Sequence, residues 1–470
     1  MRKKLFALVM AGIMASSLAG CGETATTPSG DAASSTASAV SATTAAPAEA
    51  ATTEATGEAK STDATASGDK VVVSVLCAYA SEDPHGKYVY QYAKAYEETH
   101  PNVQIDITAI SSNDILTKLS AMATNTDDLP TLFWTSGDMA PSENDLGLME
   151  DIGSYIDDDT KAGFANGVVD GCTLDNKMVI YPIDVQPSAV IYRKDRFEEA
   201  GLSVPTTWED FLKCAQALTK DSDGDGQIDQ WGFSMVGSNN SSGQSRFMAY
   251  LWSNGLDILT DDGGEWKAKL DGDDFLKAFT FWTDMNNKYQ VVPTGITEVD
   301  YATAANYFAM GYTSMILSGS NALGVAYDSN PDLKGKLGSF VIPGGNPGTM
   351  LNAEGYGLCK YATDEEKAAA IDYLKFFSSN DSDMMFWQSS GKIPATLDGQ
   401  KADYISGDDY KGYLDTIAQG CRPVLNFAGM GGLKTALGDA YSSVFSGEKT
   451  NEEAVKQLQS DVDTLLEDYN

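Results

Sequence analysis

A short acidic loop carries a recognisable metal-binding pattern. Residues 221–229 read DSDGDGQID, with carboxylates at the first, third, fifth and ninth positions. This spacing follows the start of an EF-hand calcium loop, in which Gly226 suits the sharp turn. The twelfth position is Gly232, where a bidentate Glu is usual. The pattern leaves two interpretations open, a structural Ca²⁺ site or a metal-free Asp turn. The candidate metal ligands are Asp221, Asp223, Asp225, Gln227 and Asp229.

The chain is poor in the residues that many enzymes use for proton transfer. Only two of its 470 residues are histidines, His85 and His100. This scarcity disfavours a histidine metal cluster, a Ser–His triad or a histidine acid/base pair. The formal net charge is -35, and no basic block offsets it. We therefore do not expect nucleic acid as a partner, because phosphate binding needs a basic stripe.

The N-terminus has the parts of an export signal in order. Three basic residues at 2–4 precede an apolar run at 5–14, which is too short to span a bilayer as a helix. The following Leu-Ala-Gly-Cys at 18–21 resembles a lipoprotein cleavage box, although an ordinary signal peptide is the alternative. We expect residues 1–20 to be a lipoprotein signal peptide. We expect Cys21 to carry a lipid anchor that holds the protein on the extracytoplasmic face of the cell membrane.

Residues 21–69 differ in composition from the rest of the chain. Of the 48 residues from 22 to 69, 33 are Ala, Ser or Thr, and none is aromatic. Such a segment cannot bury enough apolar surface to offset its conformational entropy. We therefore predict a disordered tether. Its root-mean-square reach is roughly 35–40 Å for a flexible chain of this length.

A folded body is predicted from Lys70 onward. A β-rich run at 71–76 is followed by an apolar helical face within 89–96, an alternating strand pattern at 103–110 and a second short strand at 131–134. A further helical pattern lies between the last two strands. Strands that alternate with helices in this way favour an α/β sheet.

Three later helices have recognisable boundaries. Thr207 is placed to cap a helix that begins at Trp208, with acidic residues in its first turn. Thr363 and Glu366 form a capping box before another helix. An apolar stripe over 455–469 predicts a final helix.

Several segments are weak signals one by one but form a specific pattern when they occur in this order along the chain. They are 96–103 (YEETHPNV), 128–133 (DLPTLF), 181–182 with 191–195 (YP and IYRKD), 200–211 (AGLSVPTTWEDF), 311–319 and 369–377 with 391–394 (GKIP). Together they resemble the family-1 extracellular solute-binding proteins, the maltose-binding-protein-like branch. The sequence departs from the family pattern at Thr131, Arg193, Ser314 and Ser320-Asn321, where Asp, Asn, Ala and an aromatic residue are usual.

The resemblance implies an α/β, two-lobed periplasmic-binding-protein fold of type II. Its two discontinuous α/β lobes would close over a ligand in the cleft between them. We expect residues 70–182 and 318–378 in lobe I, and residues 183–317 and 379–470 in lobe II. The chain is expected to cross between lobes near 181–186, near 315–320 and after Phe377.

The candidate ligand residues are aromatic or planar polar groups near the carboxyl ends of strands or near the crossings. Sugars offer apolar faces and rims of hydroxyls, which such side chains bind, and strand ends face the ligand crevice in open α/β sheets. For each aromatic residue, core packing is the alternative. The candidates are Tyr79, Glu82, Trp134, Asp184, Gln186, Trp252, Ser320, Asn321, Glu354, Tyr356 and Trp387.

The resemblance implies a monomeric, non-enzymatic solute-binding component of a bacterial ABC importer. It would capture a carbohydrate, with an oligosaccharide favoured, and deliver it to the permease transmembrane subunits. The alternatives are a peptide, polyamine or metal-complex ligand, a sensor that reports to a membrane receptor, and an anchored glycoside hydrolase. Five cysteines remain besides Cys21, so at most two disulfides can form, and their spacing matches no zinc site.

Overall fold

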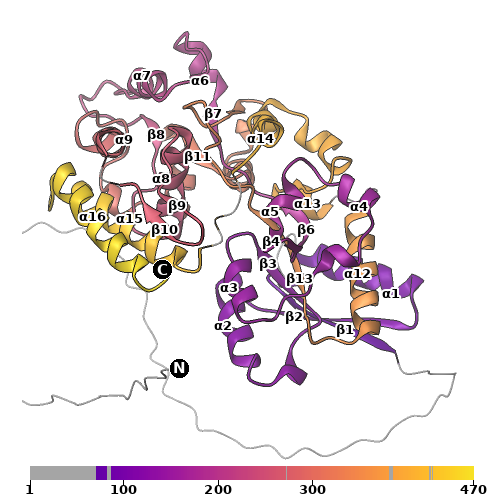
Figure 1. Cartoon of the computed structure of the whole chain (residues 1–470). Coiled ribbons are helices and arrows are strands. Elements are labelled where there is room, and N and C mark those ends of the chain that lie inside the picture. The colour runs from indigo at the N-terminus through magenta and orange to yellow at the C-terminus, as the bar shows by residue number, and fades with distance from the viewer. Residues whose placement is uncertain (1–69, 82–85, 271, 380–384, 423–424, 426) are drawn as a thin grey trace, which may run out of the picture. The chain divides into compact units, whose positions relative to one another are not determined.

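The computed structural model describes residues 70–81, 86–270, 272–379, 385–422, 425 and 427–470. The predicted signal peptide, Cys21, the tether and Glu82 lie outside the described residues. Two mixed sheets organise the described chain (Figure 1).

The first sheet has six strands in the order β14-β6-β13-β3-β1-β2. Strand β1 pairs in parallel with β2 and β3, and β13 pairs antiparallel with β3 and β6. The runs predicted at 71–76, 103–110 and 131–134 are confirmed as β1, β2 and β3. The strands are β1 (Val71–Cys77), β2 (Val103–Ala109), β3 (Leu132–Ser136), β6 (Tyr181–Val185), β13 (Ala353–Leu358) and β14 (Ile393–Pro394).

Helices α1 (Gly86–Thr99), α2 (Ser112–Met122) and α12 (Asp364–Ser379) accompany the first sheet. The predicted face of α1 is buried, and Tyr96 lies edge-on to Tyr373 of α12 with ring centroids 5.4 Å apart. The capping box before α12 is present, because Thr363 and Glu366 exchange side-chain and backbone hydrogen bonds. The Tyr96–Tyr373 contact holds α12 against α1, and α12 also packs on β1.

The second sheet has four strands in the order β12-β7-β11-β8. Its core is aromatic, and Trp208 at the start of α7 lies 4.8 Å from Tyr250 between ring centroids. Thr207 caps α7 by accepting a hydrogen bond from Asp210 N, as predicted. The elements are β7 (Ala189–Arg193), β8 (Trp231–Ser234), β11 (Thr313–Ser318), β12 (Leu337–Phe340), α7 (Trp208–Leu218), α8 (Ser241–Ser253) and α9 (Asp273–Asn287).

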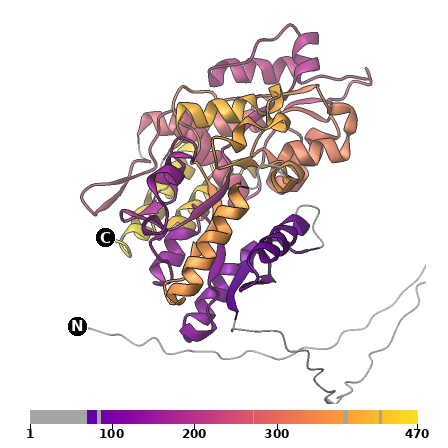
Figure 2. The same ribbon diagram turned by 90° about the vertical axis from the view of Figure 1, so that its right-hand side faces the viewer.

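The chain ends in α15 (Met430–Phe445) and α16 (Asn451–Leu466), drawn in yellow (Figures 1 and 2). They pack on each other and on α9, and α15 also packs on α8. The final helix is confirmed, but the prediction that Tyr469 belongs to its stripe is wrong. The helix ends at Leu466, and Tyr469 packs edge-on against Phe427.

The remaining elements are short connections and satellite helices. They are η1 (Thr126–Asp128), α3 (Ala140–Asp145), η2 (Ile152–Ser154), α4 (Asp158–Ala162), α5 (Val168–Gly171), β4 (Thr173–Leu174), β5 (Lys177–Met178), α6 (Lys194–Glu199), β9 (Leu259–Asp261), β10 (Trp266–Ala268), η3 (Ile296–Glu298), α10 (Tyr301–Ala309), α11 (Asn321–Ser329), η4 (Pro331–Leu333), α13 (Met385–Ser390), η6 (Gly399–Lys401), η7 (Asp403–Ile405) and α14 (Asp408–Gln419).

The passages between the sheets differ in part from the sequence-based expectation. The first lies between β6 and β7, close to the expected 181–186. The chain does not return at 315–320, because β11 leads through α11 to β12, which pairs with β7 in the same sheet. The return lies between β12 and β13. Strand β14 pairs with β6, so it belongs to the first sheet although 379–470 was assigned to lobe II. Strand pairing over long sequence separations decides these memberships.

The cysteines that the structure describes are free thiols, so no disulfide crosslinks the described residues. Four of them are buried and behave as small apolar groups. Among the described helices, none combines the length and the apolar character needed to cross a membrane.

Candidate functional site

The candidate site begins at one edge of the six-stranded sheet. Strands β1, β3 and β6 run in the same direction and end at this edge, where the antiparallel β13 and β14 begin. Tyr79 follows β1, Asp184 lies at the end of β6, Glu354 lies at the start of β13, and Lys392 immediately precedes β14. Strand direction therefore brings together four polar side chains that are far apart in the sequence.

These side chains form one hydrogen-bonded cluster around an ammonium group. Lys392 Nζ donates to Tyr79 Oη at 2.6 Å, to Asp184 Oδ2 at 3.3 Å and to Glu354 Oε2. The Tyr79 hydroxyl donates to Glu354 Oε2 at 3.2 Å, and Gln186 Nε2 donates to Glu354 Oε1 at 3.0 Å. Two carboxylates thus share one lysine, and with both ionised the cluster has one excess negative charge.

Burial makes the electrostatics of this cluster strong. Asp184 is 1% exposed, and burial raises its pKa above the ordinary value against the opposing attraction of Lys392. Burial alone would lower the pKa of Lys392, but the charges of Asp184 and Glu354 outweigh it and raise that pKa well above normal. Asp184 Oδ1 is buried and has no hydrogen-bond partner among the described residues. The cluster therefore offers an unused acceptor at the sheet edge.

Aromatic side chains surround the cluster. Tyr79 lies edge-on to Trp134 and Phe386, with ring centroids 6.4 Å and 5.3 Å away. The predicted candidates Tyr356 and Trp387 lie deeper. Tyr356 Oη contacts Cys77 Sγ at 3.4 Å, and Trp387 Nε1 donates to the Ile183 carbonyl at 3.0 Å. These two side chains are buried in the packing behind the cluster.

A cavity of about 280 Å³ lies beside the end of β3. Gly137 N donates to the Ala353 carbonyl, which ties this loop to the residue before Glu354. In the cavity lining, Lys434 Nζ lies 3.8 Å from Asp138 Oδ2. The lining combines apolar, hydroxyl, amide and charged groups: Asp138, Pro141, Ser142, Ser241, Gln244, Met350, Leu425, Phe427, Ala428, Met430, Gly431 and Lys434.

None of the predicted ligand residues lines this cavity, so sequence reasoning missed this part of the site. Asp138 lies two residues after the end of β3, the strand that contains the predicted Trp134. Applying the strand-end rule to the loop beyond the strand would have found Asp138. Lys392 lies in the quoted Gly-Lys-Ile-Pro segment but was given no role. Lys434 had no local signal, because only the packing of α15 brings it to Asp138.

The predicted residues of the second sheet lie in two places. Ser320 and Asn321 follow β11, and a Cβ atom built on Gly319 would lie 3.0 Å from Asn321 Oδ1 and 3.6 Å from Gln186 Oε1. Gln186 therefore connects the charged cluster with this strand end. Trp252 is buried on α8, and the guanidinium carbon of Arg422 lies over it, 5.4 Å from the centroid of the Trp252 ring. Trp252 does not line the cavity.

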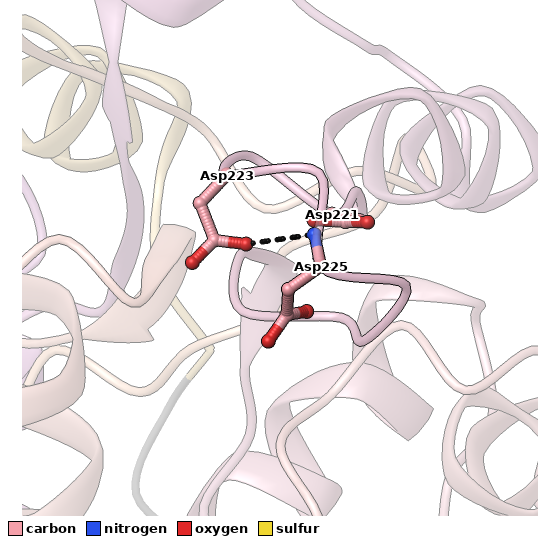
Figure 3. Close-up of side chains that lie close together, drawn as sticks. All are labelled: Asp221, Asp223 and Asp225. Atoms are coloured by element: carbon pink, nitrogen blue, oxygen red, sulfur yellow. Dashed lines mark hydrogen bonds between the residues drawn. The ribbon is translucent and has the colours of Figure 1, made fainter.

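The acidic loop after α7 brings three of its five predicted ligands together. Ligand atoms of Asp221, Asp223 and Asp225 lie within 4.8 Å of one another. Figure 3 shows Asp223 accepting a hydrogen bond from Asp225 N at 3.1 Å. Asp229 is engaged elsewhere, because its carboxylate accepts from the Ser222 amide and hydroxyl. An oxygen-rich group of this kind suits a hard divalent cation such as Ca²⁺.

The arrangement at the sheet edge is suited to binding rather than to bond cleavage. It offers carboxylate and carbonyl acceptors, ammonium and amide donors, and aromatic and methionine faces, which is what a polyhydroxylated ligand needs. The carboxylates of Asp184 and Glu354 both contact Lys392, so they lie close together on the same ammonium group. Glycosidases instead place two carboxylates on opposite sides of the scissile bond.

Comparison with known proteins gives one consistent family. The family model described as bacterial extracellular solute-binding protein matches residues 79–384. A binding protein of Brucella abortus is 24% identical over 389 residues, which cover 81% of this chain and 90% of the relative. The melibiose/raffinose/stachyose-binding protein MelE of Bacillus subtilis is 21% identical over 341 residues, covering 69% of this chain and 74% of MelE.

Solved structures share the fold at low identity. The cyclic alpha-maltosyl-1,6-maltose binding protein from Arthrobacter globiformis has a TM-score of 0.69 and 23% identity, covering 85% of this chain and all of that one. Maltose-bound MalE3 of T. maritima also has a TM-score of 0.69, with 22% identity, covering 84% of this chain and 99% of that one. The predicted periplasmic-binding-protein fold, with two mixed sheets, is confirmed.

Proposed function

Because the chain belongs to the bacterial extracellular solute-binding protein family, we propose that it captures an oligosaccharide and delivers it to an ABC permease. The family consists of non-catalytic transport components, and the chain is the solute-binding component of such a system. The observation that carries the carbohydrate assignment is the joint presence of the cavity beside β3 and the charged cluster at the neighbouring strand ends.

The site chemistry supports a sugar over a peptide or polyamine. Phe427, Met350 and Met430 give the cavity an apolar face, and Ser142, Ser241 and Gln244 give it short polar groups for hydroxyls. MelE and the maltose-bound and maltosyl-maltose-binding structures are named for oligosaccharide ligands, which supports the same class here. On this proposal the ligand also contacts Tyr79, Gln186, Asn321 and Glu354, and the two sheets mark the two lobes.

The test is a thermal-shift screen of the mature chain against neutral oligosaccharides, with di- and tripeptides and spermidine as comparison ligands. Stabilisation by at least one oligosaccharide is the expected result, since a ligand present at 100 times its Kd stabilises the native state by about 2.7 kcal/mol. Stabilisation by spermidine or peptides alone would replace the sugar assignment with the alternative ligand class.

We propose that the protein is a lipoprotein anchored through Cys21 on the outer face of the cell membrane and acts as a monomer. The support is the order of basic, apolar and small residues before Cys21. Metabolic labelling with an alkyne fatty acid should label the parent and not Cys21→Ser. Equal labelling of both proteins would remove the anchor.

We propose that the loop of Asp221, Asp223 and Asp225 binds a structural Ca²⁺, completed by water or by other oxygen ligands. The support is the grouping of three carboxylates within 4.8 Å, whose mutual repulsion a cation would relieve. Calorimetric titration with CaCl₂ should release or absorb heat with the parent and not with Asp223→Asn/Asp225→Asn. No heat from the parent would leave a metal-free Asp turn.

A further inference from the structure

Arg246 on α8 brings a fixed positive charge to the end of β11. Its guanidinium spans from the first turn of α8 to the end of β11. Nε donates to the Leu317 carbonyl at 2.8 Å, and Nη1 donates to the carbonyl of Ser242 at 3.0 Å and to its hydroxyl. Nη2 donates to Ser318 Oγ at 3.3 Å. The flat face of the group lies over the Tyr301 ring, 5.0 Å from its centroid.

This guanidinium is nearly saturated with hydrogen bonds but lacks a counter-charge. An arginine has five N–H donors, and the protein occupies four of them. Arg246 takes part in none of the ion pairs within 4.0 Å among the described residues, although the chain has 67 acidic and only 32 basic residues. Burial lowers the pKa of Arg246, and only the neighbouring hydroxyls of Tyr301 and Tyr413 oppose that effect. Arg246 is half-buried, and a charge that is partly removed from water without a counter-ion is uncommon, because desolvation is costly.

Two further buried hydroxyl groups belong to Tyr301, whose ring lies under the guanidinium, and to Ser320, two residues after the Ser318 that binds it. Ser320 is 1% exposed, and its Oγ has no hydrogen-bond partner among the described residues. The Tyr301 hydroxyl is buried, faces the Ser318 side chain and makes no hydrogen bond of standard geometry in the described chain. Both are hydrogen-bond donors, as is the remaining N–H of Arg246. Two hydroxyl donors, one guanidinium N–H and a positive charge therefore lie in a part of the structure where the described residues supply no carboxylate.

This donor group belongs to the ligand-facing part of the molecule. Ser320 directly follows Gly319, whose position lies next to Gln186 Oε1, and Gln186 donates to Glu354 of the charged cluster. Ser242, which binds Arg246, is the neighbour of Ser241 in the cavity lining. A ligand held by the cavity and the cluster would thus have the Arg246 group within reach.

We propose that Arg246, Ser320 and Tyr301 form a subsite for an oxyanion carried by the saccharide, such as the carboxylate of a uronic acid. The inference rests on the proposed sugar-binding function and specifies its ligand class. A neutral hydroxyl would satisfy a donor but not the charge, whereas an oxyanion supplies both acceptors and the missing counter-charge. The protein's net negative charge opposes such a ligand at long range, but that repulsion is screened beyond about 8 Å at physiological salt.

The experiment compares matched ligands by calorimetric titration of the mature chain. The probes are maltose and melibiose, each beside the same disaccharide with one primary alcohol oxidised to a carboxylate, and beside its 6-phosphate. We expect an anionic form to bind the parent at least tenfold more tightly than its neutral counterpart. Arg246→Gln should abolish this preference, and Arg246→Lys should keep part of it. Preference for carboxylate or for phosphate would identify the source of the oxyanion.

Ser320→Ala and Tyr301→Phe guard against a folding defect in Arg246→Gln. Each removes a hydroxyl that makes no hydrogen bond of standard geometry in the described chain and leaves the hydrogen bonds of Arg246 intact, so folding should be unchanged. Each should weaken binding of the anionic form several-fold and that of the neutral form less than twofold. Equal binding of neutral and anionic forms by the parent overturns the subsite while leaving sugar binding intact. Absence of binding by every disaccharide overturns the proposed function as well.

Discussion

Glu143 provides a quantitative test of the electrostatics beside the cavity. This α3 side chain is fully buried, accepts a hydrogen bond from Thr135 Oγ1, and has no partner for its second oxygen among the described residues. Burial raises its pKa from 4.5 to about 8, with a smaller contribution from Asp138. The folded protein therefore keeps a proton that the unfolded chain loses above pH 4.5.

The sign and size of the pH effect follow from proton linkage. Below pH 4.5 both states hold the proton and the group costs nothing. As the pH rises from 4.5 to 8, the free energy of unfolding falls, by about 1 kcal/mol or less at pH 5 and by about 4 kcal/mol at pH 8. Glu143→Gln removes the titration and keeps the shape. The gain in free energy of unfolding of the variant over the parent should therefore be about 3–4 kcal/mol larger at pH 8 than at pH 5.

The assay is thermal unfolding of parent and variant, followed by circular dichroism at pH 5, 6.5 and 8. For a body of this size the gain in Tm over the parent should grow by about 4 °C between pH 5 and pH 8. Glu467→Gln, which changes an exposed glutamate, is the matched control and should show no such trend. A gain for Glu143→Gln that is constant over this range would refute an uncharged, buried Glu143.

Three further predictions test packing and the cluster. Lys392→Met leaves two neighbouring carboxylates without their cation, so urea unfolding at pH 7.5 should show a free energy of unfolding lower by about 3–5 kcal/mol. Because Asp184 can take up a proton, the loss should be smaller at pH 5. An equal loss at both pH values would contradict the raised pKa of Asp184. Thr207→Ala removes the α7 cap and should cost about 1 kcal/mol in the same assay, whereas the exposed neighbour change Thr206→Ala should cost under about 0.5 kcal/mol; equal costs would deny the cap. Asp138→Asn breaks the pair with Lys434 in the cavity lining. It should change the Kd for an oligosaccharide in calorimetry while leaving Tm nearly unchanged. An unchanged Kd would exclude Asp138 from the site.

Local patterns were sufficient for several elements and for the family. The valine-rich run gave β1, the Thr207 cap gave α7, and the Thr363 capping box gave α12. Each of these signals depends on side chains within a few residues of one another. The ordered motifs also predicted the fold that the solved structures share.

The site could be predicted only in part, because its assembly depends on distant strand pairing. Strand ends indicated Asp184 and Glu354 as candidates, and the structure brings them into one cluster with Tyr79 and Gln186. The lysine that unites them precedes β14, whose partner β6 lies about 200 residues earlier. No local pattern reports such a pairing. Tyr356 and Trp387 illustrate the converse, since the same rule cannot distinguish a ligand contact from a side chain that packs behind it.

The central claim is that a saccharide binds at the edge of the six-stranded sheet. Its most direct test is calorimetric titration of a stabilising oligosaccharide into the parent and into Glu354→Gln. This substitution removes the excess negative charge of the cluster and weakens the acceptor that Tyr79 and Gln186 share. Saturable binding by the parent and at least tenfold weaker binding by Glu354→Gln is the predicted result. Undiminished affinity of Glu354→Gln, with its Tm preserved, would place the ligand elsewhere and contradict this account.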